Sequence, residues 1–234
     1  MLLKAWYRWL SCLLIQRRHR RVLVVEAGCE LQIAPSARVV SIGAGRLRLE
    51  RGSRLVLHEG ARLELRGSFS VGRDCTLVVH PHGALKLGAQ SWCLHGCWIE
   101  VAAGETIEIG DAVSLQLRCS LHGAVTIGDH TLVAPEVYIS SGTHVFDAWP
   151  GLPIREQDRR AASSRPVVVG RQCWLGLRTW VAPGLTLADG TVTGANSVIT
   201  RSTQAWSVYA GVPARRLRTY RSAEALAPES IDPR

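Results

Sequence analysis

The chain has 234 residues, 47% of them apolar, and a formal net charge of +9. Its length is enough to bury a core in one domain, and no apolar stretch reaches the roughly 18 residues that a membrane-spanning helix needs. The seven cysteines lie in a chain too long and repetitive for a disulfide scaffold, so we expect compact apolar fillers in a reducing cytoplasm.

The first predicted element is an amphipathic helix over residues 1–21. Six positive charges precede the first acid, Glu26. Two interpretations are open: the helix lies on the surface of an anionic membrane, or it covers the N-terminal end of the following domain. No small-residue cleavage site follows, which argues against a signal peptide. Further along, acids and bases are interspersed, which disfavours nucleic-acid binding. The apolar face consists of Leu2, Leu3, Trp6, Trp9, Leu10, Leu13 and Leu14.

Residues 22–87 carry a looser repeat. The pairs Leu47/Leu49 and Leu55/Leu57 alternate as strand residues do, with a turn at Gly52 between them. The period here is eight residues. We expect wide coils in this stretch and a step into a shorter repeat between Gly88 and Ala103.

From Ile109 to Gln204 a branched or aliphatic residue returns at every sixth position, and only Thr193 breaks the series. A period of six fits neither an amphipathic helix nor one long strand. It fits a solenoid in which each hexad contributes a short strand and a turn, so that each repeat buries its apolar face on its neighbours. We therefore predict an all-β parallel β-helix over residues 22–204. The repeating positions are Ile109, Leu115, Leu121, Ile127, Val133, Ile139, Val169, Leu175, Val181, Leu187 and Ile199.

The hexads run to His144 and resume in phase at Val169. The proline-containing, mixed-charge segment 145–168 is therefore predicted to be a loop extruded from one corner, where function is often found. Residues 205–234 form a third part, with a basic segment over 206–220 and a small polar tail that we expect to fray.

One group of possible metal ligands lies near the middle of the chain: Cys93, His95, Cys97, Cys119 and His122. Their spacings match none of the usual zinc patterns, and stacked coils bring unrelated residues close together. We interpret them as structural residues and predict no metal site.

Two segments carry a specific resemblance to a known family. Residues 127–147, IGDHTLVAPEVYISSGTHVFD, and residues 168–218, which end in AGVPARRLR, resemble the hexapeptide-repeat O-acetyltransferases of the maltose and galactoside type. The resemblance covers about Ile109 to Arg218. It implies a left-handed parallel β-helix, a homotrimer with active sites between subunits, and acetyl-CoA as co-substrate. That handedness opposes the usual right-handed crossover preference.

Position by position, the resemblance places the catalytic histidine at His144. It aligns Ser114 with a family asparagine that contacts the acceptor, and His122 with an acidic residue of the same wall; these departures indicate an acceptor other than a simple sugar. The residues that it implies for coenzyme binding are Trp174 beside the acyl donor, Leu177 and Ala195 along the pantetheine arm, and Arg201, Arg215 and Arg218 near the phosphates.

The chemistry expected at His144 is general base catalysis. The acceptor hydroxyl must lose its proton as it attacks the thioester, and a neutral imidazole suits that task near pH 7. Asp147 is close enough in sequence to orient the ring or to bind the acceptor, and both roles stay open. No Ser or Cys adjoins His144 in a nucleophile arrangement, so we expect direct transfer without an acyl-enzyme.

Several functions are compatible with these features. The leading hypothesis is O-acetylation of a bacterial polysaccharide or lipid-linked glycan precursor, in the cytoplasm or at the inner face of the plasma membrane. A small-molecule or antibiotic acceptor is the second. A γ-carbonic anhydrase would require a His-x4-His pair, which the eight histidines do not contain. A purely structural β-solenoid would need neither the loop after His144 nor the Gly-Val-Pro-Ala-Arg ending.

Overall fold

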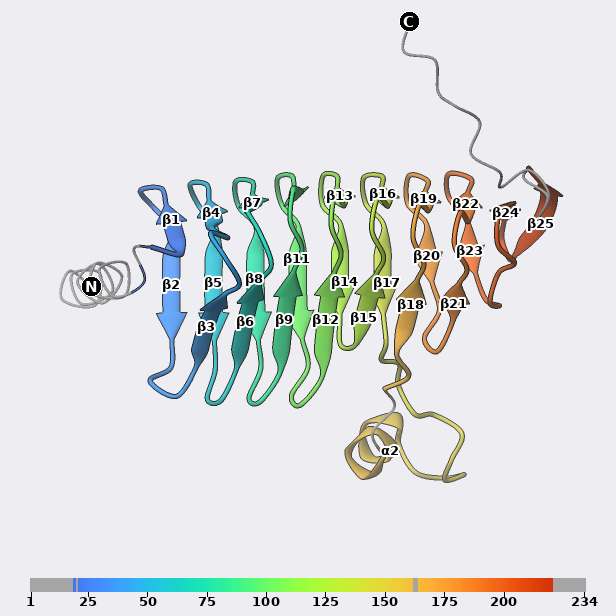
Figure 1. Ribbon diagram of the computed structural model, residues 1–234. Helices are drawn as coiled ribbons and strands as arrows, with labels where there is room; N and C mark the ends of the chain where they lie inside the picture. The colour runs from blue at the N-terminus through green and yellow to red at the C-terminus, as the bar shows by residue number, and fades with distance from the viewer. Residues whose placement is uncertain (1–18, 20, 162–163, 221–234) are drawn as a thin grey trace, which may run out of the picture.

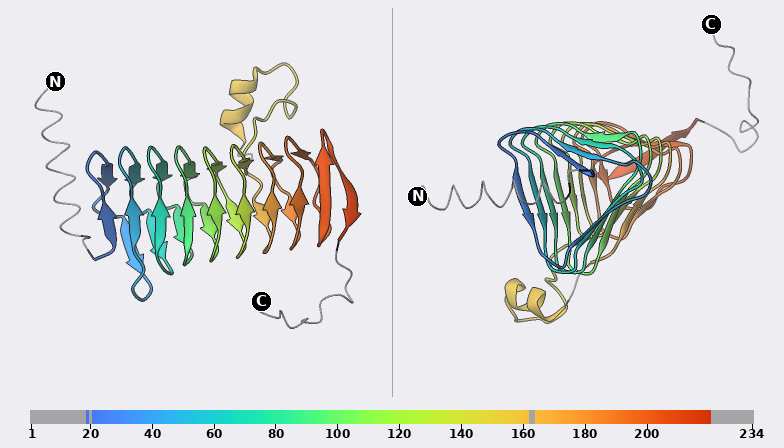
Figure 2. Two further views of the ribbon diagram at one scale, coloured as in Figure 1. Left: turned by 90° about the horizontal axis from the view of Figure 1, so that it is seen from above. Right: turned by 60° about the vertical axis from the view of Figure 1, so that its left-hand side comes forward.

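The computed structural model describes residues 19, 21–161 and 164–220, which form a three-sided prism of stacked coils (Figures 1 and 2). The predicted helix over residues 1–21 and the tail from 221 onward fall almost wholly outside the described residues. Within the described part of the chain, no helix has the length and apolarity to span a membrane.

Each coil contributes one strand to each of three sheets, which we call A, B and C. Sheet A contains β1 (Leu23–Val25), β4 (Leu47–Leu49), β7 (Phe69–Val71), β10 (Ser91–Cys93), β13 (Ser114–Leu115), β16 (Leu132–Val133), β19 (Trp174–Leu175), β22 (Val192–Thr193), β24 (Ser207–Gly211) and β25 (Ala214–Thr219). Sheet B contains β2 (Glu30–Ile33), β5 (Arg54–Leu57), β8 (Thr76–Val79), β11 (Trp98–Val101), β14 (Ser120–His122), β17 (Tyr138–Ser140), β20 (Trp180–Val181) and β23 (Val198–Ile199). Sheet C contains β3 (Arg38–Ser41), β6 (Arg62–Leu65), β9 (Ala84–Leu87), β12 (Thr106–Ile109), β15 (Val125–Ile127), β18 (Val167–Val169) and β21 (Thr186–Leu187).

Apart from the coil that carries the loop and the final step from β22 to β24, the coils have three lengths: 24 residues for the first coil, 22 for the later wide coils and 18 for the narrow coils. In the second half Ser114 pairs with Leu132, and the two positions are three hexads apart in the sequence. The six-residue period therefore predicted these narrow coils. In the first half Leu47 pairs with Phe69, so a coil there is longer than three hexads. These wide coils advance by eight, eight and six residues, which confirms the eight-residue period read from the leucine pairs.

The change from wide to narrow coils occurs later than the sequence suggested. Val101 and Ile109 are the corresponding buried positions of β11 and β12, and they are still eight residues apart. The hexads begin only at Ile109. Placing the step between Gly88 and Ala103 was therefore wrong, because the glycines there are turn residues of a wide coil.

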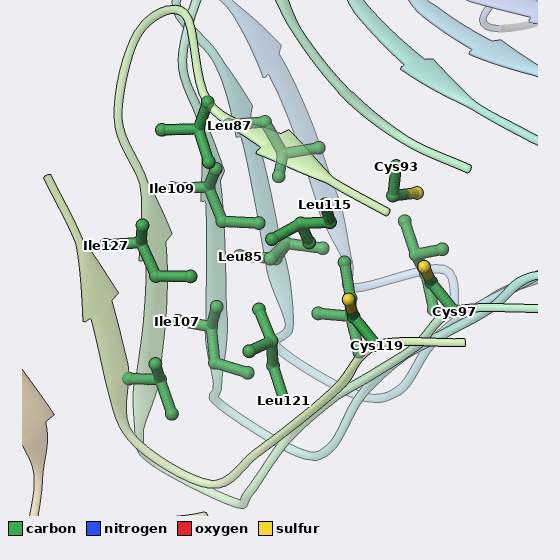
Figure 3. Packing of buried hydrophobic residues seen from close by; sticks show 14 of the residues in the cluster. Leu85, Leu87, Cys93, Cys97, Ile107, Ile109, Leu115, Cys119, Leu121 and Ile127 are labelled. Carbon is green, nitrogen blue, oxygen red and sulfur yellow. The ribbon is translucent and has the colours of Figure 1, made fainter. Parts of the chain in front are cut away.

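The core is a continuous stack of aliphatic side chains inside the prism (Figure 3). Cysteines fill its tighter corners and hydrogen-bond to the next coil. The thiol of Cys97 donates to the carbonyl of Gln116 at 3.0 Å, and that of Cys119 donates to the carbonyl of Ala134 at 3.2 Å. Ser53 does the same to Gly72 at 2.7 Å. The structure thus places Cys119 in the compact interior position that the repeat predicted.

A glycine followed by an aspartate recurs at the corners between sheets C and A, as Gly110-Asp111 and Gly128-Asp129. Asp129 Oδ1 accepts a hydrogen bond from the backbone N–H of Asp111 at 2.8 Å, in the coil before it. A Cβ on Gly110 would lie only 2.3 Å from that oxygen. Glycine at this corner therefore makes room for the carboxylate that caps the neighbouring turn.

Thr193 is the residue that breaks the hexad series; its side chain is buried, and its hydroxyl has hydrogen-bond partners. Its hydroxyl accepts a hydrogen bond from the N–H of Gly176 at 2.9 Å and pairs with the hydroxyl of Thr179 at 2.8 Å. Beyond it, β24 and β25 form an antiparallel hairpin that extends sheet A. This hairpin carries the basic C-terminal segment.

Candidate active site

The predicted loop leaves the corner between sheets B and C and carries a helix, α2 (Ile154–Arg160), outside the prism (Figure 2). The buried side chain of Gln157 holds this loop together. Its Nε2 donates to the carbonyls of Phe146 at 3.0 Å and Leu152 at 2.9 Å, and its Oε1 accepts from the N–H of Trp149 at 3.1 Å. The loop is therefore a folded unit with its own hydrogen-bonded centre.

His144 lies at the start of this loop, and 82% of its side chain is exposed. Its Nδ1 contacts Oδ2 of Asp158 on α2. The other oxygen of Asp158 accepts the backbone N–H of Val145 at 2.7 Å. The bond from Val145 and the contact with His144 hold the pKa of the Asp158 carboxyl below its ordinary value. A carboxylate at Nδ1 fixes the proton there, which leaves Nε2 as the basic nitrogen.

Asp158 is the residue that the sequence reasoning missed. The sequence left Asp147 open between orienting the ring and binding the acceptor, and in the structure the contact with Nδ1 of His144 comes from Asp158. The sequence signal was present: Pro153 precedes a run of good helix formers over residues 154–160, and a helix would have brought an acid back toward His144. We had read the run only as a mixed-charge loop. The acceptor-binding role of Asp147 remains a prediction.

A groove of about 620 Å³ runs along sheet B to the residues that lead into His144. The residues after β17, including Ser140, Ser141 and Gly142, form one end of it. Its walls also include His80, Glu100, Glu105, His122 and Tyr138. This volume is within the ~300–1,000 Å³ typical of small-molecule sites.

Glu100 joins two histidines in the wall of this groove. Its Oε1 lies 2.8 Å from Nε2 of His80, and its Oε2 lies 3.6 Å from Nδ1 of His122. Desolvation raises the pKa of Glu100, but the hydrogen bond from His80 and the two imidazoles outweigh it and lower the pKa. Burial lowers the pKa of His122, and the neighbouring Glu100 carboxylate opposes this shift only in part. His80 is thus part of this cluster.

The structure separates the two residues that were predicted together on the acceptor wall. His122 is on sheet B in the groove, whereas Ser114 is buried on sheet A, beside Leu132 of the next coil. Among the described residues that line the groove, His122 is present and Ser114 is not.

Most of the predicted coenzyme residues lie away from the B/C corner that carries His144; Arg201, after β23, is the exception. Leu177 and Ala195 occupy the corner between sheets A and B in successive coils, and Trp174 is 53% exposed on the adjoining strand of sheet A. Arg201 follows β23 of sheet B, and Arg215 and Arg218 are exposed on β25. His144 is at the corner between sheets B and C. The coenzyme residues along the A/B edge therefore do not surround the histidine of the same chain.

The cysteines that approach one another are not the set singled out from the sequence. Among the described residues, the Sγ atoms of Cys75, Cys93 and Cys97 lie within 4.8 Å of one another and could together hold a metal ion. Hydrogen bonding to Cys93 lowers the pKa of Cys75, but a hydrogen bond to Cys97 and desolvation raise it to about 11.

Comparison with known proteins identifies two curated relatives from Escherichia coli (strain K12). WbbJ, assigned as a lipopolysaccharide biosynthesis O-acetyl transferase, is 39% identical over 161 residues, which cover 63% of this chain and 81% of WbbJ. WcaF, assigned as a colanic acid biosynthesis acetyltransferase, is 32% identical over 119 residues, 51% of this chain and 58% of WcaF. The match thus spans less than two thirds of WcaF. No family model matches the chain.

Among solved structures, the polySia specific acetyltransferase NeuO aligns over 86% of this chain and 93% of its own, with a TM-score of 0.51 and 16% sequence identity. At that identity the likeness speaks for the fold alone. The fold is a left-handed parallel β-helix, as the resemblance implied, with the extruded loop that the hexad interruption predicted.

Proposed function

The chain belongs to the hexapeptide-repeat acetyltransferases, and from that premise we propose that it transfers an acetyl group from acetyl-CoA to a hydroxyl of a bacterial exopolysaccharide, capsule or lipopolysaccharide glycan precursor. The observation that carries this proposal is the exposed imidazole of His144, with Nδ1 on Asp158, where the loop begins beside the groove.

The proposed reaction is a single transfer in a ternary complex. Nε2 of His144 accepts the proton of the acceptor hydroxyl while its oxygen attacks the thioester carbonyl. A new C–O bond forms, the C–S bond breaks, and the proton passes from the imidazolium to the departing thiolate. Asp158 stabilises the imidazolium of His144 after it has taken up the proton and before the thiolate receives it. A positioned general base of this kind contributes about 10²–10⁴-fold to the rate.

The donor side of the proposed site is supplied by a second copy of the chain in a homotrimer. We assign Trp174, Leu177 and Ala195 to the acyl end and pantetheine arm of the coenzyme, and Arg201, Arg215 and Arg218 to its phosphates. The separation of the A/B edge from His144 supports this arrangement, since an edge of one chain must meet the B/C edge of another to enclose a thioester. In the same assembly Ser114 of one chain would approach His122 of the next.

The acceptor class is inferred from the chemistry of the groove and from the relatives. WbbJ and WcaF are assigned to the biosynthesis of bacterial surface glycans. The groove offers hydroxyl, imidazole and carboxylate groups beside an exposed tyrosine, which suits a sugar better than an apolar drug.

The test is release of free thiol from acetyl-CoA by the full chain with two sets of acceptors. One set contains oligosaccharides and nucleotide sugars, and the other contains hydroxyl-bearing antibiotics. We expect turnover with the first set. Turnover confined to the antibiotics, or none with either set, would contradict the proposed function.

Mixing two inactive variants tests the site between chains. His144→Ala and Trp174→Ala each disable a different edge, so co-refolded mixtures contain some interfaces with both edges intact. For random mixing in a symmetric trimer we expect about one quarter of wild-type activity. Failure of mixed oligomers to exceed the separate variants would show that one chain holds the whole site.

We also place the enzyme in the cytoplasm, with the basic segment 1–21 contacting an anionic membrane. Deleting residues 1–21 should abolish co-sedimentation with anionic vesicles at low salt. Equal co-sedimentation of the full chain and the truncated variant would contradict membrane binding by residues 1–21.

A further inference from the structure

The groove on sheet B extends well away from His144. Gly142, Gly123 and Glu105 mark the same B/C corner in three successive coils. Because neighbouring rungs are about 4.8 Å apart, Glu105 lies about 10 Å along the prism from the loop entry. A sugar whose hydroxyl reaches His144 would leave this far end open for a neighbouring unit.

A buried acceptor without a partner lies between the coil of Glu105 and the loop entry. Glu105 Oε2 is shielded from solvent and has no hydrogen-bond partner among the described residues. Nearby, the hydroxyl of Ser141 is already engaged by the N–H of Ala124 at 2.9 Å and by Ser164 at 2.9 Å. A buried polar atom left unpaired is costly. A donor from a bound ligand would satisfy it.

Glycine keeps the space beside this oxygen open. A Cβ on Gly123 would lie 3.2 Å from Glu105 Oε2 and 2.0 Å from Ser141 Oγ. Gly123 also has a φ of +83°, which side-chain-bearing residues rarely adopt. A side chain at this corner would therefore press on both the Glu105 carboxylate and the Ser141 hydroxyl, and glycine preserves the arrangement of the groove wall.

Two carboxylates face the groove, those of Glu100 and Glu105. The Glu100 carboxylate is hydrogen-bonded to His80, and burial lowers the pKa of the neighbouring His122 imidazole. A second carboxylate or a phosphate would be repelled here, whereas hydroxyl groups can donate to both glutamates.

Aromatic side chains flank these acids. The ring of His122 lies 5.3 Å from that of Tyr138 and 6.1 Å from that of Trp98. Tyr138 and Trp98 are both exposed on the outer face of sheet B. A pyranose has an apolar C–H face, and burying that face on such rings removes apolar surface from water while its hydroxyls meet the acids.

We propose that this part of the groove is a second acceptor subsite, which binds a neutral, hydroxyl-rich sugar next to the sugar that is acetylated. A hydroxyl of this sugar donates to the Glu105 carboxylate, which rotates to present its unpaired oxygen to the groove, and the two glutamates exclude acidic sugars. The proposal rests on the proposed function for the position of the reacting unit. His80, Glu100 and Glu105 precede Ile109, so the subsite draws on coils outside the segment that resembles the family.

The kinetic test compares neutral hexose disaccharides of gluco and galacto configuration with their uronate counterparts and with the monosaccharides. For the wild type we expect at least tenfold higher kcat/KM on neutral disaccharides than on uronates. Glu105→Gln should raise KM for neutral disaccharides about tenfold, since a charge-assisted bond is weakened, and leave kcat and monosaccharide turnover unchanged. Glu59→Gln, an exposed acid remote from this groove, is the matched control.

Equal use of neutral and acidic disaccharides by the wild type would overturn the subsite, as would equal losses on mono- and disaccharides in Glu105→Gln. A binding measurement without acetyl-CoA tests the subsite independently of acetyl transfer. Titration calorimetry of the same disaccharides without acetyl-CoA should show neutral-selective binding that Glu105→Gln weakens. Such binding supports the subsite even if no acetyl transfer occurs, and its absence refutes it.

Discussion

The wide and the narrow coils solve the same packing problem differently. In the wide coils a strand such as β5 (Arg54–Leu57) or β6 (Arg62–Leu65) buries two leucines, so each coil encloses a wider apolar core. In the narrow coils most strands have two residues, and small or hydrogen-bonding side chains such as Thr131, Cys173 and Thr179 fill the corners. The wide half thus depends on aliphatic volume, and the narrow half on close backbone approach and corner hydrogen bonds.

This difference bears on function. The loop with His144 and the predicted coenzyme residues belong to the narrow coils, where each coil is three hexads long. The register there survives the insertion of the loop, because Tyr138 before it pairs with Trp180 after it. The wide coils contribute only the far wall of the groove. Substitutions in the two halves should therefore have different consequences.

The largest effect on stability is expected in the wide half. Phe69 is fully buried on β7, so Phe69→Ala should lower the free energy of unfolding by about 3–5 kcal/mol. Chemical denaturation measures it. The neighbouring outward residue allows a matched control, Ser70→Ala, which should change stability by less than about 0.5 kcal/mol. Similar losses for both variants would show that the wide core is not well packed.

The narrow half should instead be sensitive to added atoms. A Cβ on Gly128 would lie 2.7 Å from the backbone N of Arg171 and from the carbonyl carbon of Gly170. Gly128→Ala should therefore cost about 1–3 kcal/mol of stability. Gly142, whose added Cβ would have its nearest neighbour at 3.9 Å, supplies the control. A Gly128→Ala protein as stable as Gly142→Ala would contradict the close approach of the narrow coils.

The coils of the narrow half could be predicted from the sequence more completely than those of the wide half. The hexad period follows directly from a repeat that places one inward residue in each short strand, so Ile109, Leu115 and Leu121 identified the narrow coils. The wide repeat mixes steps of eight and six residues, and its end at Ile109 could not be located from Gly88 or Ala103, because turn glycines occur in both coil types. Side-chain periodicity thus predicts strands better than coil boundaries.

Asp158→Asn addresses the orientation of the catalytic ring. An asparagine can present an amide to Nδ1 instead of a carboxylate and favour the wrong tautomer, so kcat should fall about tenfold, equivalent to ~1.4 kcal/mol in the barrier. Glu156→Gln changes an acid on the same helix that contacts Arg159 instead of His144; it is the matched control and should leave kcat within twofold of wild type. Equal losses from the two variants would contradict a specific role for Asp158 at the ring.

The smallest effect concerns pH. The pKa of Asp158 lies below its ordinary value of 3.8, chiefly through the bond from Val145. A lowered pKa means that this carboxylate stabilises the loop at higher pH, and the stabilisation is lost as pH falls through the folded-state value. The amide shift of Val145 in NMR should therefore titrate with a midpoint below 3.8. The amide of Ser141, which donates to a carbonyl of His122, should show no such transition.

The site was predicted unevenly for physical reasons. His144 follows the last hexad before the loop, so its position was fixed by the repeat and by motif similarity. Asp158 depends on how the loop folds back, and Glu100 and His80 meet only because successive wide coils are stacked in register. Pairings of this kind require knowledge of the coil length, which the wide half did not reveal.

The most direct test of the central claim is the turnover number of His144→Ala against acetyl-CoA and the best glycan acceptor. Because the side chain is exposed, the melting temperature should stay that of the wild type, as for the control His130→Asn at another exposed turn. The account predicts a fall in kcat of at least about 10²-fold for His144→Ala and no change for the control. A folded His144→Ala protein with wild-type turnover would contradict it.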